Sequence, residues 1–219
     1  VSLPWHYIPV WILISTPLFY SVLFFGGIIF ILRRVILRIH ISTFEWLNLY
    51  IFFLPLLAII FLHSIVYDGW RHMYFVYPSF IVISLIGLEN GIIFLKKNKL
   101  IINTAIVGIT IYGIFIGFQM ARLHPYENVY FNFIAGKSLN ECGKRFEVDY
   151  WGLSYKEGLE FILKNDSSPT IVVCAAELPP GIFNAKMFSE RENARLSFTD
   201  EIELSDYFLT SYRFHHFPY

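Results

Sequence analysis

Long apolar segments dominate the first 121 residues of the chain. Four segments are long enough to cross a bilayer, which requires about 20 predominantly apolar residues. They are residues 10–32, 46–67, 73–95 and 100–121, and only the third is interrupted, by Glu89-Asn90-Gly91. Four such segments in succession are not typical of a soluble core. The pattern therefore predicts a membrane protein whose residues 1–121 form an all-α bundle of four transmembrane helices.

Residues 122–219 have shorter, more polar patterns. Ser154-Tyr-Lys-Glu157 has the form of a capping box and precedes an apolar stripe at helical spacing. Strands are predicted over residues 146–150, 170–175, 195–198 and 207–212 from alternating or continuous apolar runs. The strand–helix–strand order predicts a parallel pair with a right-handed crossover. We expect residues 122–219 to form a small α/β domain.

The distribution of charge agrees with this division. Residues 1–120 hold seven Lys/Arg and three Asp/Glu, whereas residues 121–219 hold ten and fourteen. The whole chain is 56% hydrophobic, with 17 residues of each charge sign. This composition excludes a disordered chain, a coiled coil and a collagen-like repeat. It provides no basic excess for phosphate backbones, so no nucleic-acid partner is expected.

The connections between the predicted spans indicate their orientation. Two connections are positively charged, the first through Arg33, Arg34 and Arg38 and the third through Lys96, Lys97 and Lys99. The second connection has only Arg71, beside Asp68. Since positive loops stay in the cytoplasm, the second connection and the domain at 122–219 are expected outside. The predicted fold is thus a four-helix transmembrane bundle followed by an extracytoplasmic domain.

Asp68-Gly-Trp-Arg71-His72 is the first candidate site, in the outer hairpin. Arg71 can grip a phosphate with forked hydrogen bonds, His72 can add a donor, and Asp68 can orient Arg71. The alternative is an interfacial ion pair that anchors a short loop, with Gly69 making the turn. The spacing of Asp68, Arg71 and His72, taken alone, favours this structural alternative.

The segment that follows the last span is the second candidate, a substrate lip that combines aromatic and polar side chains. Its proposed contact residues are His124, Tyr126, Asn128, Tyr130 and Asn132. Such a surface suits a ligand held over lipid head groups. An interfacial linker whose polar side chains satisfy its own backbone explains the composition equally well.

Weaker signals lie elsewhere. Asp149 and Trp151 are candidates for a sugar or acceptor contact, although a structural turn is the favoured interpretation. Glu89 is a candidate functional residue because it lies within a predicted span. Its position near the inner membrane surface is equally consistent with an ion pair at that surface. His215-His216 is a poor metal pair, since adjacent strand residues point to opposite faces, and no metal site is assigned. Cys142 and Cys174 permit either a disulfide or free thiols.

Three of these motifs together carry a resemblance. Tyr67–His72, His124–Asn132 and Phe146–Glu157 resemble the C-terminal half of bacterial family 39-like glycosyltransferases of the GT-C superfamily. This superfamily includes the protein mannosyltransferases and the aminoarabinose lipid A transferase. Pro4-Trp-His-Tyr-Ile-Pro9 is also similar to a loop of that family. The resemblance covers nearly the whole chain, in order.

The resemblance implies a larger bacterial inner-membrane enzyme that moves a sugar from a polyprenyl-phosphate carrier to an acceptor on the outer face. It places the catalytic acidic residue in a first outer loop that this sequence lacks. The catalytic residue is therefore unassigned, and we expect the chain to be an inactive internal fragment of a longer protein. Apart from the lipid-linked donor, no cofactor is assigned, and the need for a divalent metal is open.

Two other classes remain open at this stage. One is a non-enzymatic membrane protein with an extracytoplasmic interaction module. The other is a transporter or polymerase component for lipid-linked oligosaccharides, for which several buried polar groups and helices broken at mid-depth are typical. The nearly charge-free span interiors argue mildly against the transporter.

Overall fold

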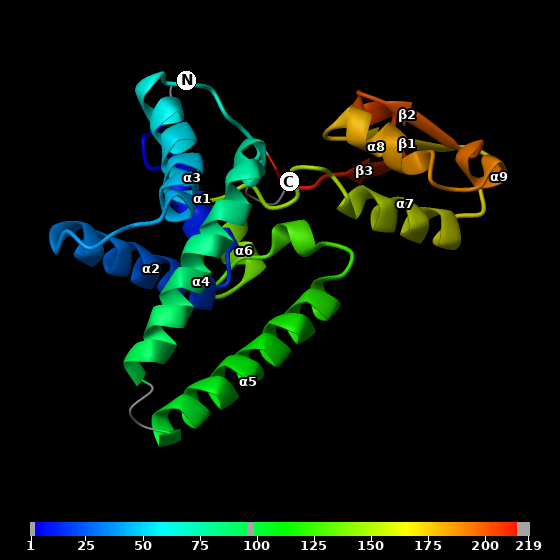
Figure 1. Ribbon diagram of the computed structural model, residues 1–219. Helices are drawn as coiled ribbons and strands as arrows, with labels where there is room; N and C mark the ends of the chain where they lie inside the picture. Colours follow the sequence, from blue (N-terminus) through cyan, green and yellow to red (C-terminus); the bar gives the residue numbers. More distant parts are fainter. Residues whose placement is uncertain (1–2, 96–98, 214–219) are drawn as a thin grey trace. The chain divides into compact units, whose positions relative to one another are not determined.

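The computed structural model describes residues 3–95 and 99–213. It contains a mostly helical part and a small three-stranded sheet (Figure 1). The chain divides into two compact units, Val1–Gly136 and Lys137–Tyr219, so the division lies fifteen residues beyond the expected boundary at 121/122. His215-His216 and the lysines at 96 and 97 lie outside the described residues.

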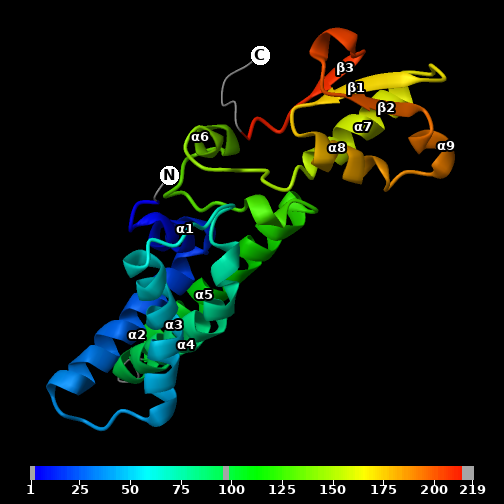
Figure 2. The same ribbon diagram turned by 90° about the horizontal axis from the view of Figure 1, so that it is seen from above.

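Among the described residues of the first unit, four helices are long and apolar enough to cross a membrane, as expected. They are α2 (Leu18–Ile36), α3 (Thr43–Phe61), α4 (Tyr77–Leu95) with the preceding 3-10 turn η1 (Arg71–Val76), and α5 (Lys99–Leu123) (Figures 1 and 2). Helix α3 begins at a capping box in which the Ser42 side chain accepts from the backbone N–H of Glu45. The Glu45 carboxylate accepts in return from the backbone N–H of Ser42.

The prediction of one continuous helix over residues 10–32 is wrong. The structure places a short helix, α1 (Tyr7–Ser15), before α2 and breaks the chain at Thr16 and Pro17. Proline has no backbone N–H, and its ring disfavours the helical conformation of the residue before it. Thr16 accordingly has an extended backbone, with φ −106° and ψ 139°. The prediction missed this break because residues 10–32 are apolar almost throughout.

Asn132 donates hydrogen bonds to the backbone carbonyl groups at this break. Its side-chain amide donates to the carbonyl oxygens of Leu13 (2.6 Å) and Thr16 (2.8 Å). Its backbone N–H donates to the carbonyl oxygen of Ile14 at 2.8 Å. Asn132 is itself 6% exposed. The segment that follows α5 is therefore held in the first unit by polar contacts that local sequence patterns do not reveal.

Helices α2 and α4 cross at close range. A Cβ atom on Gly27 would lie 2.1 Å from the carbonyl oxygen of Ile83, and one on Gly87 would lie 2.0 Å from that of Leu23. Neither contact is possible for a larger residue, so both glycines are required by the approach of the two backbones. Small residues at a crossing are typical of helices packed in membranes. Next to this crossing, Phe24 of α2 stacks on Phe80 of α4 with centroids 4.6 Å apart.

Helix α5 differs from the other three long helices. None of its residues is buried, although its mean hydropathy is the highest of the four. The helix consequently presents apolar side chains around its circumference. This surface is compatible with a lipid environment.

The second unit is a three-stranded parallel sheet with helices. In chain order the unit contains α6 (Leu139–Gly143), α7 (Ser154–Asn165), β1 (Ile171–Ala175), α8 (Leu178–Ala185), α9 (Glu190–Asn193), β2 (Leu196–Thr199), the 3-10 turn η3 (Ile202–Leu204) and β3 (Tyr207–Leu209). The strand order is β2-β1-β3, and both pairings are parallel. The expected parallel pairing of residues 146–150 with 170–175 is absent, and β1 pairs instead with β2 and β3.

The core of this unit lies between β1 and the helices α7 and α8. Leu159 and Ile162 of α7 and Ile171 and Val173 of β1 are each 3% exposed or less. Ala185 of α8 joins the same cluster. The cysteines of the unit, Cys142 and Cys174, are both buried free thiols, so the two do not form a disulfide. Burial raises the pKa of each thiol.

Two local predictions for this unit are wrong. Residues 146–150 form bends and irregular backbone that end in a turn at Tyr150 instead of a strand, and no strand of the described residues pairs with them. Ser154 begins α7, but the expected capping box with Glu157 is replaced. The Asp149 carboxylate accepts from the backbone N–H groups of Leu153 and Ser154, each at 2.9 Å, and also from the Ser154 hydroxyl. The cap thus comes from a residue that the sequence pattern did not single out for it.

Candidate functional site

The loop between α3 and η1 folds around an ion pair. Asp68 and Gly69 both adopt left-handed backbone conformations, with φ values of 57° and 69°. A Cβ atom on Gly69 would lie 3.2 Å from the ring of Trp11, so glycine allows both the turn and this contact. Asp68 is 6% exposed, and its carboxylate lies 2.7 Å from the guanidinium of Arg71. Asp68 therefore orients Arg71.

The ring of Tyr67 completes this cluster. The Arg71 guanidinium lies 5.1 Å from the centroid of the Tyr67 ring, a cation–π distance. The His72 ring meets the same tyrosine edge-on, with centroids 4.9 Å apart. Arg71 is largely buried, whereas His72 is exposed. All three predicted residues of the first candidate site are thus gathered around one loop, and their role toward a phosphate stays a prediction.

The second candidate segment divides into residues with different surroundings. His124 is exposed and forms an ion pair with Glu127 at 2.7 Å. The side-chain hydrogen bond with His124 lowers the pKa of the Glu127 carboxyl below its usual value, with smaller contributions from a backbone hydrogen bond and from the charge of His124. Asn132 donates hydrogen bonds to backbone carbonyl oxygens at the break between α1 and α2. Tyr126 is half-buried, beside the turn η2 (Glu127–Val129).

Asn128 and Tyr130 line a cavity that joins the two candidate segments. The cavity has a volume of about 310 Å³, and we call it the tyrosine pocket. Its walls come from Ser15, Thr16, Trp70, Tyr74, Tyr77, Glu127, Asn128 and Tyr130. These residues belong to the α1–α2 break, the Asp68–His72 loop, the start of α4 and the segment after α5. The pocket thus includes Asn128 and Tyr130 of the second candidate, whereas Asp68, Arg71 and His72 of the first do not line it and only Trp70 of their loop does.

The tyrosine pocket contains polar atoms that are buried without a hydrogen-bond partner among the described residues. They are the side-chain nitrogen and oxygen of Asn128 and the hydroxyl of Thr16, which is 1% exposed. Leaving such a group unsatisfied costs about 1–3 kcal/mol. Buried polar groups in native proteins are nearly always paired with protein or ordered water. The Thr16 and Asn128 side chains thus leave unused hydrogen-bonding capacity in the wall of the pocket.

Aromatic rings form the rest of the pocket. The Trp70 ring meets Tyr74 and Tyr77 edge-on, with centroid distances of 4.9 and 5.9 Å. The Trp70 indole N–H donates to the Ser15 hydroxyl at 2.8 Å, which fixes the orientation of the ring. Burial, with a smaller contribution from Tyr112, raises the pKa of Tyr130 to about 12, so its hydroxyl is protonated at neutral pH. Aromatic faces beside unsatisfied amide and hydroxyl groups are suited to a ligand that is both apolar and rich in hydroxyls.

The sequence reasoning missed Thr16, Tyr74 and Tyr77. The signal for Thr16 was available in the Thr16-Pro17 dipeptide inside an apolar run, because such a dipeptide interrupts a helix. The two tyrosines gave no local signal, since they were counted as part of a span. Glu89 lies away from the tyrosine pocket and lines a different cavity.

The tail residues Asp149 and Trp151 have separate surroundings. Asp149 caps the N-terminus of α7 through its hydrogen bonds with Leu153 and Ser154. Trp151 is 52% exposed and makes a ring contact with Tyr150. Neither residue lines the cavities described here. The structural interpretation of Asp149 as a turn residue is therefore supported by its contacts, and a ligand role for Trp151 stays a prediction.

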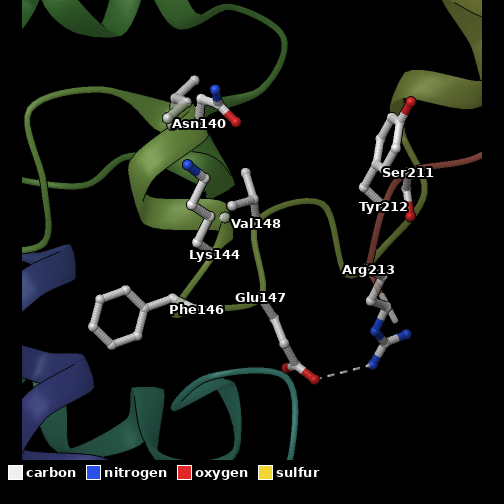
Figure 3. A pocket seen from close by; sticks show the side chains of 10 residues that line it. Asn140, Lys144, Phe146, Glu147, Val148, Ser211, Tyr212 and Arg213 are labelled. Atoms are coloured by element: carbon white, nitrogen blue, oxygen red, sulfur yellow. Dashed lines mark ion pairs between the residues drawn. The ribbon is translucent and has the colours of Figure 1, made fainter. Parts of the chain in front are cut away.

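The second unit has its own cavity, of about 380 Å³, which we call the tail pocket (Figure 3). Asn140 and Lys144 lie on one side of it, and Ser211 and Tyr212 lie on the other (Figure 3). An ion pair between Glu147 and Arg213, at 3.9 Å, lies at its edge. The pocket mixes both charge signs with apolar groups, so its lining does not specify one ligand.

Glu177 is a further polar residue that the sequence reasoning missed. It lies two residues after β1, at the C-terminal end of this strand. β1 is the central strand of the sheet, with β2 on one side and β3 on the other. The Glu177 carboxylate accepts hydrogen bonds from the hydroxyls of Tyr155 and Ser211, the latter at 3.1 Å. Burial, together with the bond to Glu177, raises the pKa of Tyr155 to about 12. Polar residues at this edge of a parallel sheet are a general signal for a site, although here they bond mainly to each other.

Comparisons with known proteins add no family to this description. Within the described residues, no group of three or more His, Cys, Asp or Glu side chains is placed to hold a metal ion. No family model, no curated protein and no solved structure matches the chain.

Proposed function

We propose that the chain is the C-terminal part of an integral membrane glycosyltransferase. The enzyme transfers a sugar from a polyprenyl-phosphate carrier to an acceptor on the outer face of a bacterial inner membrane. The tyrosine pocket holds the sugar of the lipid-linked donor, and Arg71 interacts with the carrier phosphate. The catalytic residue is supplied by a part of the enzyme outside this chain.

One observation carries the proposal. The wall of the tyrosine pocket combines aromatic rings with Asn128 and Thr16, whose amide and hydroxyl atoms are unpartnered, and it includes Trp70, the residue before Arg71. A sugar offers hydroxyls to the polar atoms and C–H faces to the rings. A guanidinium nearby stabilises the charge that develops on a phosphate leaving group. The two halves of a lipid-linked sugar phosphate thus find complementary groups side by side.

The location of the pocket supports a membrane carrier. It lies at the start of α2 and α4 and beyond the end of α5, so it sits at one end of the apolar helices. The opposite helix ends carry Arg33, Arg34 and Lys99. By the positive-inside rule the pocket faces outward and the second unit is extracytoplasmic. A polyprenyl chain in the outer leaflet would reach the pocket without leaving the bilayer.

The break between α1 and α2 bears on the transporter alternative. In transporters, broken helices meet at the middle of the membrane. Here Thr16 shares a pocket with Tyr77, the first residue of α4, so the break lies at the helix ends. This location favours a site at the membrane surface, as a transferase requires.

Binding to the chain in lipid nanodiscs tests the proposal without requiring catalysis. We expect saturable binding of polyprenyl-phosphate hexose, tighter than that of polyprenyl phosphate. Asn128→Ala should weaken binding of the sugar-linked carrier about tenfold, the value of one or two hydrogen bonds. Binding of polyprenyl phosphate alone should not change. Asn165→Ala, an exposed asparagine on α7, is the matched control.

Arg71 requires a paired variant, because its removal takes the ion-pair partner from buried Asp68. We therefore compare Asp68→Asn/Arg71→Gln with Arg122→Gln, an exposed arginine at the end of α5. The double variant should lose affinity for both phosphates and retain affinity for the dephosphorylated polyprenol. Equal binding of all three lipids by the wild-type chain would contradict the proposal and favour an interaction module.

A further inference from the structure

A second cavity in the first unit lies at the helix ends opposite the tyrosine pocket. It has a volume of about 740 Å³ and lies among α2, α3, α4 and the connection that follows α2. Its apolar walls include Phe30, Leu37, Phe44, Ile86 and Ile93. Four charged residues share it, namely Arg33, Arg34, Glu45 and Glu89. We call it the Arg33–Glu89 cavity.

Two of these four charges are already satisfied. The Arg34 guanidinium forms an ion pair with Glu45 and donates to the carbonyl oxygen of His40. The Glu45 carboxylate also accepts from the backbone N–H and the hydroxyl of Ser42 at the start of α3. This pair therefore has a structural role, because it joins the end of α2 to the start of α3.

The other two charges are not paired in this way. Across residues 3–95 and 99–213, neither Arg33 nor Glu89 forms an ion pair, and both are exposed. The Glu89 position is unusual, because acidic residues are costly near the hydrocarbon and are retained there for a reason. One cation and one anion thus open into a single cavity whose remaining surface is largely apolar.

This arrangement complements a molecule that carries a phosphate and an ammonium group on an apolar body. We propose that the Arg33–Glu89 cavity binds a zwitterionic phospholipid with a primary ammonium, its phosphate on Arg33 and its ammonium on Glu89. The acyl chains lie along Phe30, Ile86 and Ile93. Arginine binds phosphate through forked donors, and an ammonium donates up to three hydrogen bonds to a carboxylate.

The charge balance distinguishes this ligand from other membrane lipids. A purely anionic lipid would place its headgroup beside Glu89, where like charges repel. A quaternary ammonium lipid has no N–H group for the Glu89 carboxylate. This inference rests on the membrane placement in the proposed function and is independent of sugar transfer.

Native mass spectrometry of the detergent-purified chain measures the binding directly. The three probes are phosphatidylethanolamine, phosphatidylcholine and phosphatidylglycerol with matched acyl chains. We expect phosphatidylethanolamine to bind about tenfold more tightly than the other two, the value of a hydrogen bond to a charged group. Glu89→Gln should reduce phosphatidylethanolamine to the level of phosphatidylcholine without weakening phosphatidylglycerol. Arg33→Gln should weaken all three.

The controls separate this proposal from folding and from the transferase. Arg38→Gln and Glu160→Gln change exposed charges outside the cavity, so lipid binding should not change. Thermal unfolding of Glu89→Gln without added lipid shows whether the variant folds. Equal binding of the three lipids, or a Glu89→Gln variant that keeps the preference, would overturn the inference. Neither result affects the carrier-binding test at the tyrosine pocket, where a failure would in turn leave this preference standing.

Discussion

The side-chain amide of Asn132 donates a hydrogen bond of 2.6 Å to the carbonyl oxygen of Leu13. In a continuous helix, that carbonyl would accept from the backbone nitrogen four residues later. That residue is Pro17, which has no N–H. A side chain from beyond the last long helix thus supplies a hydrogen bond that the proline removes. The same break lets Thr16 line the tyrosine pocket.

We predict that Asn132→Leu destabilises the first unit by about 2–4 kcal/mol, since the substitution leaves two buried carbonyls without donors. Thermal unfolding in detergent measures the change. Asn165→Ala, whose side chain bonds only within the exposed surface of α7, should change stability by less than about 0.5 kcal/mol. Equal effects of the two substitutions would argue against the role assigned to Asn132.

Glycine at the α2–α4 crossing gives a second prediction. Gly87→Ala places a Cβ atom against the backbone carbonyl of Leu23, which cannot rotate away, so α2 and α4 must separate. We expect a loss of stability of about 1–3 kcal/mol, typical of overpacking. Gly91→Ala lies one turn later on the same helix and has open space around it. That control should be neutral or slightly stabilising, because alanine favours a helix more than glycine does.

The sequence predicted the coarse arrangement well because long apolar runs have few alternatives in water or lipid. The regions of the four membrane-length helices were located, although the first helix begins at Leu18 and not at residue 10, and the buried strand at 171–175 was located as well. The errors occurred where a single residue inside or next to a pattern changes the local structure. Pro17 ends the first helix and Asn132 then bonds the carbonyls of Leu13 and Thr16, while Asp149 took the capping role expected of Ser154 and Glu157.

The candidate site was predictable only in its parts. The Asp68–His72 loop and the segment with Asn128 and Tyr130 were both selected for their composition. Nothing in either segment indicates that they meet at Thr16, because that contact depends on how α1, α4 and the chain after α5 pack. Asn132 was predicted to contact a ligand. In the structure its side chain instead donates hydrogen bonds to backbone carbonyl oxygens.

Tyr155 gives a prediction about alkaline pH. Its folded-state pKa is raised to about 12 from an ordinary value near 10. Between these values the unfolded chain loses the phenolic proton and the folded chain keeps it, so the contribution is complete below pH ~10 and lost as pH rises through ~12. Tyr155→Phe should therefore lose less stability between pH 9 and 11 than the wild type. Parallel slopes in denaturant titrations of the second unit, followed by Trp151 fluorescence, would contradict this.

The cysteines give a chemical prediction. Cys142 and Cys174 are buried and free, and burial raises the pKa of both thiols, so the folded chain should react slowly with iodoacetamide at pH 7.5. After unfolding without a reductant, both should be alkylated, which intact mass spectrometry counts directly. Alkylation that appears only after reduction would show a disulfide and contradict the structure.

The central claim is that the tyrosine pocket receives the sugar of a lipid-linked donor. The most direct measurement is photo-crosslinking of the nanodisc-embedded chain with polyprenyl-phosphate hexose carrying a photoreactive group on the sugar, mapped by peptide mass spectrometry. We predict saturable crosslinks in the segments 68–77 and 124–130, suppressed by unlabelled donor and by Asn128→Ala. Saturable crosslinks confined to the tail pocket or to the Arg33–Glu89 cavity, or no saturable crosslink at all, would contradict the account.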